Sequence, residues 1–313
     1  METLNQMNRN IMRTKHILLA LFALLFSITV HPVAAQSTFK LDPQASTFIS
    51  NSQIGCIYQY KVVSLKRETA VNPNETGTII DTYNTILQAN ASVSKFWDWN
   101  LLKMDSIQFS STIELSRDSL EKLKYIYDRN IRCLFLPVIF KNYPNGKITV
   151  TDKIVQDDYI YQEDKIERQW TLIDDTLTVC GYRCNKAETT FGGRKWVAWY
   201  APEIAISDGP WKLYGLPSLI LKAIDSTKTH SFEAVAIRNS TDPIYLRKDI
   251  TLLKIAKKDF YKNKKYFEGE KLRTEYLSDD QKKKMSIYKG VFFVGKQRTG
   301  WNTISKNSSL EFE

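Results

Sequence analysis

Histidine is the scarcest chemically versatile residue in this sequence. The 313-residue chain contains three histidines, and two of them, His16 and His31, lie in an N-terminal leader described below. A zinc hydrolase with a His-Glu-x-x-His motif needs at least two histidines at the metal. A Ser or Cys triad would depend on His230, which lies in the polar stretch 225–231, typical of an exposed hairpin turn. The sequence therefore predicts no metal centre and no cofactor, and assigns no catalytic residue.

Cysteine is also rare. Four cysteines in an exported chain allow three pairings, and the sequence leaves the choice open. Two of them, Cys180 and Cys184, would lie about 13 Å apart in a continuous strand, beyond disulfide reach unless Gly181 introduces a turn. A C-x₃-C pair without a neighbouring histidine is a weak metal signal, so we expect disulfides or buried thiols. The candidates are Cys56, Cys133, Cys180 and Cys184.

The N-terminus carries the features of a secretory signal peptide. Basic residues Arg9, Arg13 and Lys15 precede an apolar run, 17–30, and small residues up to Ala35 follow it. This run is short for a membrane span, although a retained N-terminal anchor is the alternative. We predict cleavage after Ala35 and export of the mature chain.

The rest of the chain has the alternation typical of strands. Residues 56–65 alternate in period two and are rich in β-branched and aromatic side chains. Short connections with Gly, Pro, Asn and Asp favour hairpins over βαβ crossovers. We therefore predict a mainly β domain over 36–245, with an antiparallel, twisted and open, half-barrel-like sheet. The predicted strands are 56–65, 147–155, 158–163, 168–173, 176–187, 195–200, 219–224 and 231–238.

A basic C-terminal segment, 246–313, follows and is expected to pack on the same domain. Between 245 and 300 there are 16 Lys or Arg and 7 Asp or Glu. Two helices are predicted, one at 118–127 and a cationic amphipathic one at 257–267. The lysines of the second helix either contact an anionic lipid or lipopolysaccharide surface or are simply solvated. They are Lys257, Lys258, Lys262, Lys264 and Lys265. Nucleic acid is not expected as a partner, because no recognition motif accompanies them.

The block from 180 to 225 is dense in Trp, Gly and Pro, and it contains the string GLPSLI at 215–220. Its pattern resembles the GLPGLI family, exported proteins of Gram-negative bacteria without an established biochemical function. Ser218 replaces the second glycine of that motif, which indicates that position 218 begins a strand. The matching positions are Tyr161, Glu163, Trp170, Gly181, Tyr182, Cys184, Lys186, Ala187, Phe191, Gly193, Arg194, Ala198, Trp199, Tyr200, Ile204, Gly209, Pro210, Lys212, Gly215, Leu216 and Pro217. The resemblance implies a periplasmic location and association with TonB-dependent outer-membrane transporters.

The aromatic residues of this block either fill the core or line a groove. We predict a core position for Trp199, beside Trp211 and Pro217, and partly exposed groove positions for Trp211 and Leu216. The guanidinium of Arg194 is expected to pair with Glu203 or Asp208. The candidate binding residues are Arg194, Trp199, Trp211, Tyr214, Leu216 and Pro217.

Three functions are compatible with these features. The first is a non-enzymatic envelope module that binds a lipid, a lipoprotein or a protein. The second is a glycan hydrolase that uses two carboxylates. The third is a structural surface protein, which the absence of repeats does not favour. The carboxylates available to a hydrolase are Glu163, Asp164, Asp174, Asp175, Glu203, Asp208 and Asp225.

Overall fold

A computed structural model describes residues 41–65, 78–108, 135–154 and 157–268. The chain divides into two units, Met1–Gln36 and Ser37–Glu313, and every described residue belongs to the second. The predicted signal peptide, the predicted helix at 118–127 and most of the basic segment lie outside the described residues. No helix among the described residues is long and apolar enough to cross a membrane.

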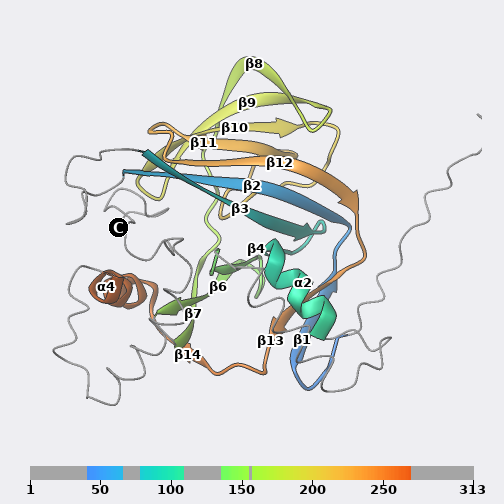
Figure 1. The fold of residues 1–313 in the computed structure, drawn as a ribbon. Coiled ribbons are helices and arrows are strands. Elements are labelled where there is room, and N and C mark those ends of the chain that lie inside the picture. Colours follow the sequence, from blue (N-terminus) through green and yellow to red (C-terminus); the bar gives the residue numbers. More distant parts are fainter. Residues whose placement is uncertain (1–40, 66–77, 109–134, 155–156, 269–313) are drawn as a thin grey trace, which may run out of the picture. The chain divides into compact units, whose positions relative to one another are not determined.

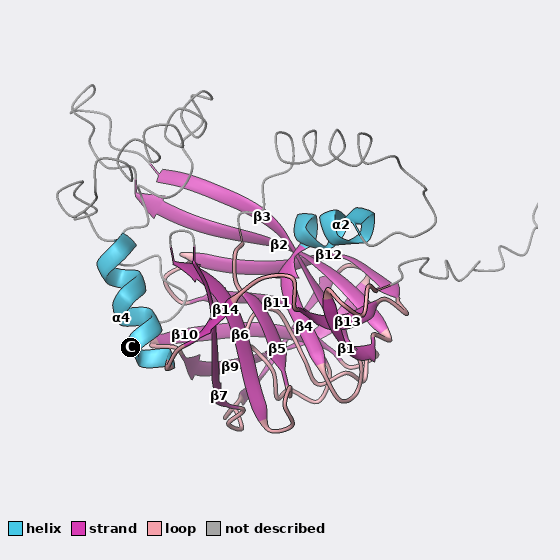
Figure 2. Cartoon of the chain, turned by 90° about the horizontal axis from the view of Figure 1, so that it is seen from below, coloured by secondary structure: helices cyan, strands magenta, loops and turns pink. Residues whose placement is uncertain are grey.

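The described chain is mainly β, as predicted, and contains helices α2 (Trp99–Gln108) and α4 (Lys257–Glu268). Figure 2 shows both helices in cyan beside the strands. The strands are β1 (Ser46–Asn51), β2 (Ile54–Leu65), β3 (Thr78–Ala89), β4 (Ser94–Asp98), β5 (Val138–Lys141), β6 (Lys147–Ile154), β7 (Asp157–Asp164), β8 (Thr171–Val179), β9 (Tyr182–Phe191), β10 (Arg194–Ala201), β11 (Leu219–Asp225), β12 (His230–Asn239), β13 (Pro243–Arg247) and β14 (Leu252–Lys254).

Twelve strands form one open sheet in the order β14-β7-β6-β5-β4-β3-β2-β12-β11-β10-β9-β8 (Figure 1). Neighbours are antiparallel except β14, which runs parallel to β7. The two remaining strands, β1 and β13, pair as a separate antiparallel sheet. The large sheet therefore has two edges, β14 and β8.

The sheet must curve strongly, because a short segment touches strands far apart in its order. Lys212 forms an ion pair with Glu163 of β7, while its neighbour Trp211 packs on Trp196 of β10. In a flat sheet, eight steps of strand spacing would separate β7 and β10 by about 38 Å. The predicted twisted and open sheet is therefore confirmed, and the connection between β10 and β11 fills its inner face.

Most of the predicted strands are present in the structure, and hairpin turns join several of them. The predicted strand 176–187 is wrong as a single element, because Cys180 and Gly181 adopt φ values of 54° and 84° and form the turn between β8 and β9. Helix α2 was not predicted. Its sequence, 99–108, has no acidic residue in its first turn and no amphipathic stripe, and its one sequence signal is the N-cap residue Asp98, which accepts the backbone N–H of Asn100.

Candidate functional site

The segment that carries most of the motif, residues 202–218, is a structural plug and is called the motif segment below. Trp211, Leu213 and Leu216 are buried in the main core cluster. The ring of Trp211 lies 5.1 Å from Phe191 and 5.6 Å from Trp196 between centroids. The expectation that Trp211 and Leu216 are partly exposed is therefore wrong, since they are 3% and 1% exposed.

Buried lysines attach the motif segment to the β5–β7 part of the sheet. The Nζ atom of Lys212 lies 2.6 Å from Oε1 of Glu163 on β7. Lys141 on β5 forms an ion pair with Asp208 and donates a hydrogen bond of 2.5 Å to the carbonyl of Gly209. A buried charge requires such a partner, since desolvation of an unpaired ion is costly. These charges therefore fix the motif segment against β5 and β7.

The chain between β7 and β8 holds the other side of the motif segment. Trp170 donates its indole N–H to the carbonyl of Tyr214 at 2.9 Å, and Arg168 donates to the carbonyl of Lys212 at 3.2 Å. Gly215 has φ of 95°, which favours glycine. A Cβ at Gly209 would approach Ile220 Cβ to 2.8 Å. Backbone conformation thus explains the glycine at position 215, and close packing explains the glycine at position 209.

Two other expectations about the aromatic block are wrong. Trp199 is half-buried and packs against the core cluster from outside, between Lys186 and Lys222, whose Nζ atoms lie 5.9 and 5.8 Å from its ring. Trp196, on the opposite face of β10, is the residue that packs on Trp211. Pro217 is exposed and does not join the core cluster. The alternation correctly predicted a strand at this position, but the side of the strand that faces the core is the side of Trp196 and not that of Trp199.

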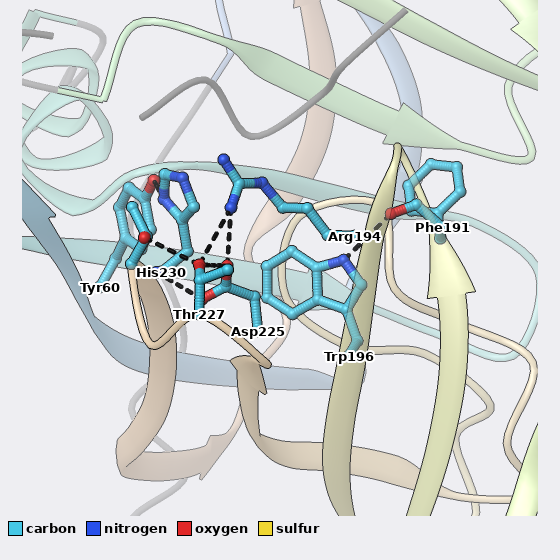
Figure 3. Close-up of polar contacts among 8 residues, drawn as sticks. Tyr60, Phe191, Arg194, Trp196, Asp225, Thr227 and His230 are labelled. Atoms are coloured by element: carbon cyan, nitrogen blue, oxygen red, sulfur yellow. Dashed lines mark hydrogen bonds and ion pairs between the residues drawn. The ribbon is translucent and has the colours of Figure 1, made fainter. Parts of the chain in front are cut away.

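A buried polar cluster joins β10 to the β11–β12 hairpin (Figure 3). Arg194 Nη1 lies 2.6 Å from Asp225 Oδ2, and Thr227 donates to the same oxygen. The backbone N–H of His230 donates to Asp225 Oδ1 at 2.8 Å. Arg194 is therefore paired with Asp225, and the expected pairing with Glu203 or Asp208 is wrong.

His230 is fully buried, so the predicted exposed turn histidine is wrong. Its Nδ1 lies 2.8 Å from the hydroxyl of Tyr60, and burial raises the pKa of Tyr60 well above its usual value. The ring of Tyr60 stacks on Phe232 with 4.3 Å between centroids. Because the imidazole sits inside the core beside this phenol, its observed contacts are structural.

The three described cysteines are free thiols. Burial raises the pKa of Cys56 to about 12 and that of Cys184 to about 11, which keeps both thiols protonated and unreactive. Cys180 is exposed, and the turn at Gly181 that a Cys180–Cys184 disulfide would require is present without the bond. Cys133 lies outside the described residues. Within the described part of the chain, no group of three or more His, Cys, Asp or Glu could hold a metal ion.

The carboxylates proposed for a hydrolase are mostly engaged in ion pairs. Glu163 contacts Lys212 and Lys257, Asp208 contacts Lys141, and Asp225 contacts Arg194. Asp164 and Asp175 pair with Lys147 and Lys186, respectively. A glycosidase needs one carboxylic acid that retains its proton. A retained proton requires a raised pKa, whereas the hydrogen bond from Lys186 lowers the pKa of Asp175.

Helix α4 uses two of its five lysines to anchor itself. Lys257 Nζ lies 2.6 Å from Glu163 Oε2, and Lys264 Nζ lies 2.6 Å from Asp152 Oδ2. Phe260 is buried between them against rings of β7. The exposed lysines, at spacings of four and three residues, are Lys258, Lys262 and Lys265.

Strand β8 offers an exposed surface that the sequence analysis missed. It pairs only with β9 among the described strands. Leu172 is 64% exposed and Leu177 is 37% exposed, although they pair with the fully buried Ala187 and Cys184 of β9. Ile166, which precedes the strand, is 68% exposed. The edge therefore presents aliphatic side chains beside backbone groups that the sheet does not use.

A second buried cluster lies in the middle of the sheet. The ammonium of Lys95 on β4 lies 3.3 Å from the ring centroid of Trp97 and 3.9 Å from that of Tyr245. Burial lowers the pKa of Lys95 to about 7, against the opposing attraction of Asp105. Asp105 on α2 accepts hydrogen bonds from Tyr245 and Arg247.

Neither a protein-family model nor a curated protein sequence matches the chain. Among solved structures, it is similar to PNGF-II in a C2 space group, with 14% identity and a TM-score of 0.41 over 67% of this chain and 32% of that one. The P21 form gives 14% identity and a TM-score of 0.40 over 68% and 33%. This chain thus spans about a third of the length of those structures.

Proposed function

We propose that this protein is an exported, non-enzymatic envelope module that binds a protein partner at the β8 edge of its large sheet. The observation that carries the proposal is the exposure of Leu172 and Leu177 on an edge strand whose outer side has no neighbour among the described strands. Soluble proteins rarely leave a long edge strand with aliphatic side chains uncovered, because such edges aggregate. A protein partner that covers the β8 edge would explain why this strand has exposed aliphatic side chains.

The motif segment supports a binding module rather than an enzyme. Trp211, Lys212 and Leu216 are buried, and their contacts hold the sheet in its curved form. The buried residues of the motif segment therefore have structural roles. That resemblance, together with the signal peptide pattern ending at Ala35, supports export to the periplasm.

Co-purification from a native periplasmic extract, followed by mass spectrometry of proteins and small molecules, tests this function. The mature chain, expected to begin at Gln36, is compared with a Leu172→Glu/Leu177→Glu variant and with a control, Val235→Glu, which alters an exposed residue of β12. We expect a protein that the wild type and the control retain and the double variant loses. Retention of a lipid alone, or equal retention by all three chains, would contradict the proposal.

A further inference from the structure

We infer that the β8 edge binds an extended, basic segment of a partner protein, which adds to the large sheet as a thirteenth strand. The inference rests on the function proposed above and specifies the chemistry of the partner. Strand β8 (Thr171–Val179) has nine residues and is rich in Thr, Ile and Leu, side chains that favour a pleated strand. Its unused backbone groups provide the main-chain hydrogen bonds of strand addition, and the side chains provide the selectivity.

The charge of β8 identifies the kind of segment that fits. The strand contains Asp174 and Asp175 and no basic residue, whereas the whole chain has a net charge of +10. Both aspartates are exposed at the irregularity of the β8–β9 register between Ile173 and Thr176. Asp174 makes no ion pair with another described residue. Asp175 is already paired with Lys186 of β9, so a lysine or arginine of an added strand would meet Asp174, and opposite charges on paired strands stabilise the pairing.

The same charges disfavour a second copy of this chain as the occupant. In the two-fold antiparallel pairing that aligns the full length of β8 with a second copy, Asp175 is the central residue and would face its own copy. Like charges directly opposite each other destabilise paired strands. A register irregularity and an acidic pair also disfavour edge-to-edge association between identical copies. The edge is therefore selective for a segment of opposite charge.

Apolar residues on both sides of the acidic pair complete the pattern. Leu172 and Leu177 flank Asp174 and Asp175 and are both exposed. Their β9 partners, Ala187 and Cys184, are completely buried. The partner segment is thus expected to place aliphatic residues next to the leucines and a basic residue between them.

A capped ten-residue peptide of alternating lysine and valine serves as the probe. We expect the mature protein to bind it at low salt, measured by fluorescence anisotropy of a labelled peptide. Asp174→Lys should weaken binding at least tenfold and should create binding of the matching glutamate–valine peptide. Val235→Glu, the control, should bind the lysine–valine peptide like the wild type. Circular dichroism and thermal unfolding of each variant show whether the fold is retained.

Two N-methylated peptides distinguish strand addition from simple charge attraction. In a strand, alternate N–H groups point to the same edge, so methylating all the lysine amides or all the valine amides removes the donors of one edge only. Strand addition predicts that one of the two peptides loses binding at least tenfold and the other keeps it. Equal binding of both, equal loss of both, or an unchanged affinity of Asp174→Lys would overturn the inference.

The outcome is separable from that of the proposed function. If the peptides fail but Leu172→Glu/Leu177→Glu still loses its natural protein partner, the partner binds the side chains of β8 without adding a strand. In that case the inference is wrong and the proposed function stands. Sedimentation of the wild type provides a further check. A dimer that Leu172→Glu dissociates would identify a second copy as the occupant and overturn the inference.

Discussion

The two edge strands of the twelve-stranded sheet differ in length and in what packs beside them. Strand β14 (Leu252–Lys254) is three residues long and leads into α4, whose Phe260 is buried against Tyr159 and Tyr161. Ion pairs from Lys257 and Lys264 hold that helix on β6 and β7. Strand β8 is nine residues long and has exposed leucines. One edge of the sheet is thus a short strand beside β6 and β7, on which α4 packs, and the other is a long strand with no helix packed on it among the described residues.

The largest expected effect concerns the motif segment, which contacts strands near both edges. Trp211→Ala should lower the free energy of unfolding by about 3–5 kcal/mol, because it removes a buried ring that packs on Phe191 and Trp196. Trp199→Ala, the matched control on the opposite face, should cost clearly less, since Trp199 is half-buried. Denaturant unfolding measures both. Equal losses would show that the motif segment is not the plug described here.

A pH effect is expected from the middle of the sheet, away from both edges. Burial lowers the pKa of Lys95 to about 7. Between pH 7 and 9, Lys95 is therefore protonated in the unfolded chain and largely deprotonated in the folded one. The free energy of unfolding should therefore rise with pH in that window, by at most about 1.4 kcal/mol per pH unit. Lys95→Met should flatten the rise and should be more stable than the wild type at pH 6.

Denaturant midpoints at half-unit pH steps measure that difference. Aromatic contacts with Trp97 and Tyr245 favour the charged ammonium, and burial opposes it. If Lys95→Met showed the same slope as the wild type, the lysine would remain charged throughout the window, and burial would not dominate.

Helix α4, packed on β6 and β7, carries three exposed lysines. Binding to vesicles with anionic headgroups should gain about 1 kcal/mol per exposed lysine and weaken steeply with salt. The triple variant Lys258→Gln/Lys262→Gln/Lys265→Gln should lose most of this binding and keep its fold. A Lys257→Gln/Lys264→Gln variant should instead lose stability, because it leaves Glu163 and Asp152 without those partners. Vesicle flotation with thermal unfolding tests both, and unchanged binding of the triple variant would mean that these lysines are merely solvated.

The smallest expected effect on stability lies at the open edge. Leu172→Glu should change the free energy of unfolding by no more than about 0.5 kcal/mol, since the residue is 64% exposed. Phe260→Ala, on the helix that packs on β7, should cost clearly more than Leu172→Glu, because its ring is fully buried. A large loss from Leu172→Glu would show that β8 is covered in solution by part of its own chain.

The sequence predicted local structure better than it predicted contacts. Alternation identified β10 and β11, which pair as antiparallel neighbours across the motif segment. Alternation could not reveal that Trp196, and not Trp199, faces the core, because that depends on strands distant in the chain. His230 was misjudged for a similar reason. The polar residues around it are typical of a turn, but Asp225 is buried and holds the hairpin against Arg194.

The open edge was invisible in the sequence for a physical reason. Strands were predicted at 168–173 and 176–187, whereas β8 runs from Thr171 to Val179 and the turn at Cys180 and Gly181 separates it from β9. Strand order depends on long-range pairing, which the local pattern of one sequence does not reveal. Position in the order, not composition, makes β8 an edge. The adjacent aspartates Asp174 and Asp175 were the signal available, since charged residues inside a strand are typical of edges.

Hydrogen–deuterium exchange with and without the lysine–valine peptide tests the difference between the two edges most directly. Amides of β8 whose N–H groups point away from β9 should exchange fast in the free protein, because they have no partner strand. Addition of the peptide should slow exchange in Thr171–Val179 and leave Leu252–Lys254 unchanged. Slow exchange throughout β8 in the free protein, or protection by the peptide at β14 instead, would contradict an open edge at β8.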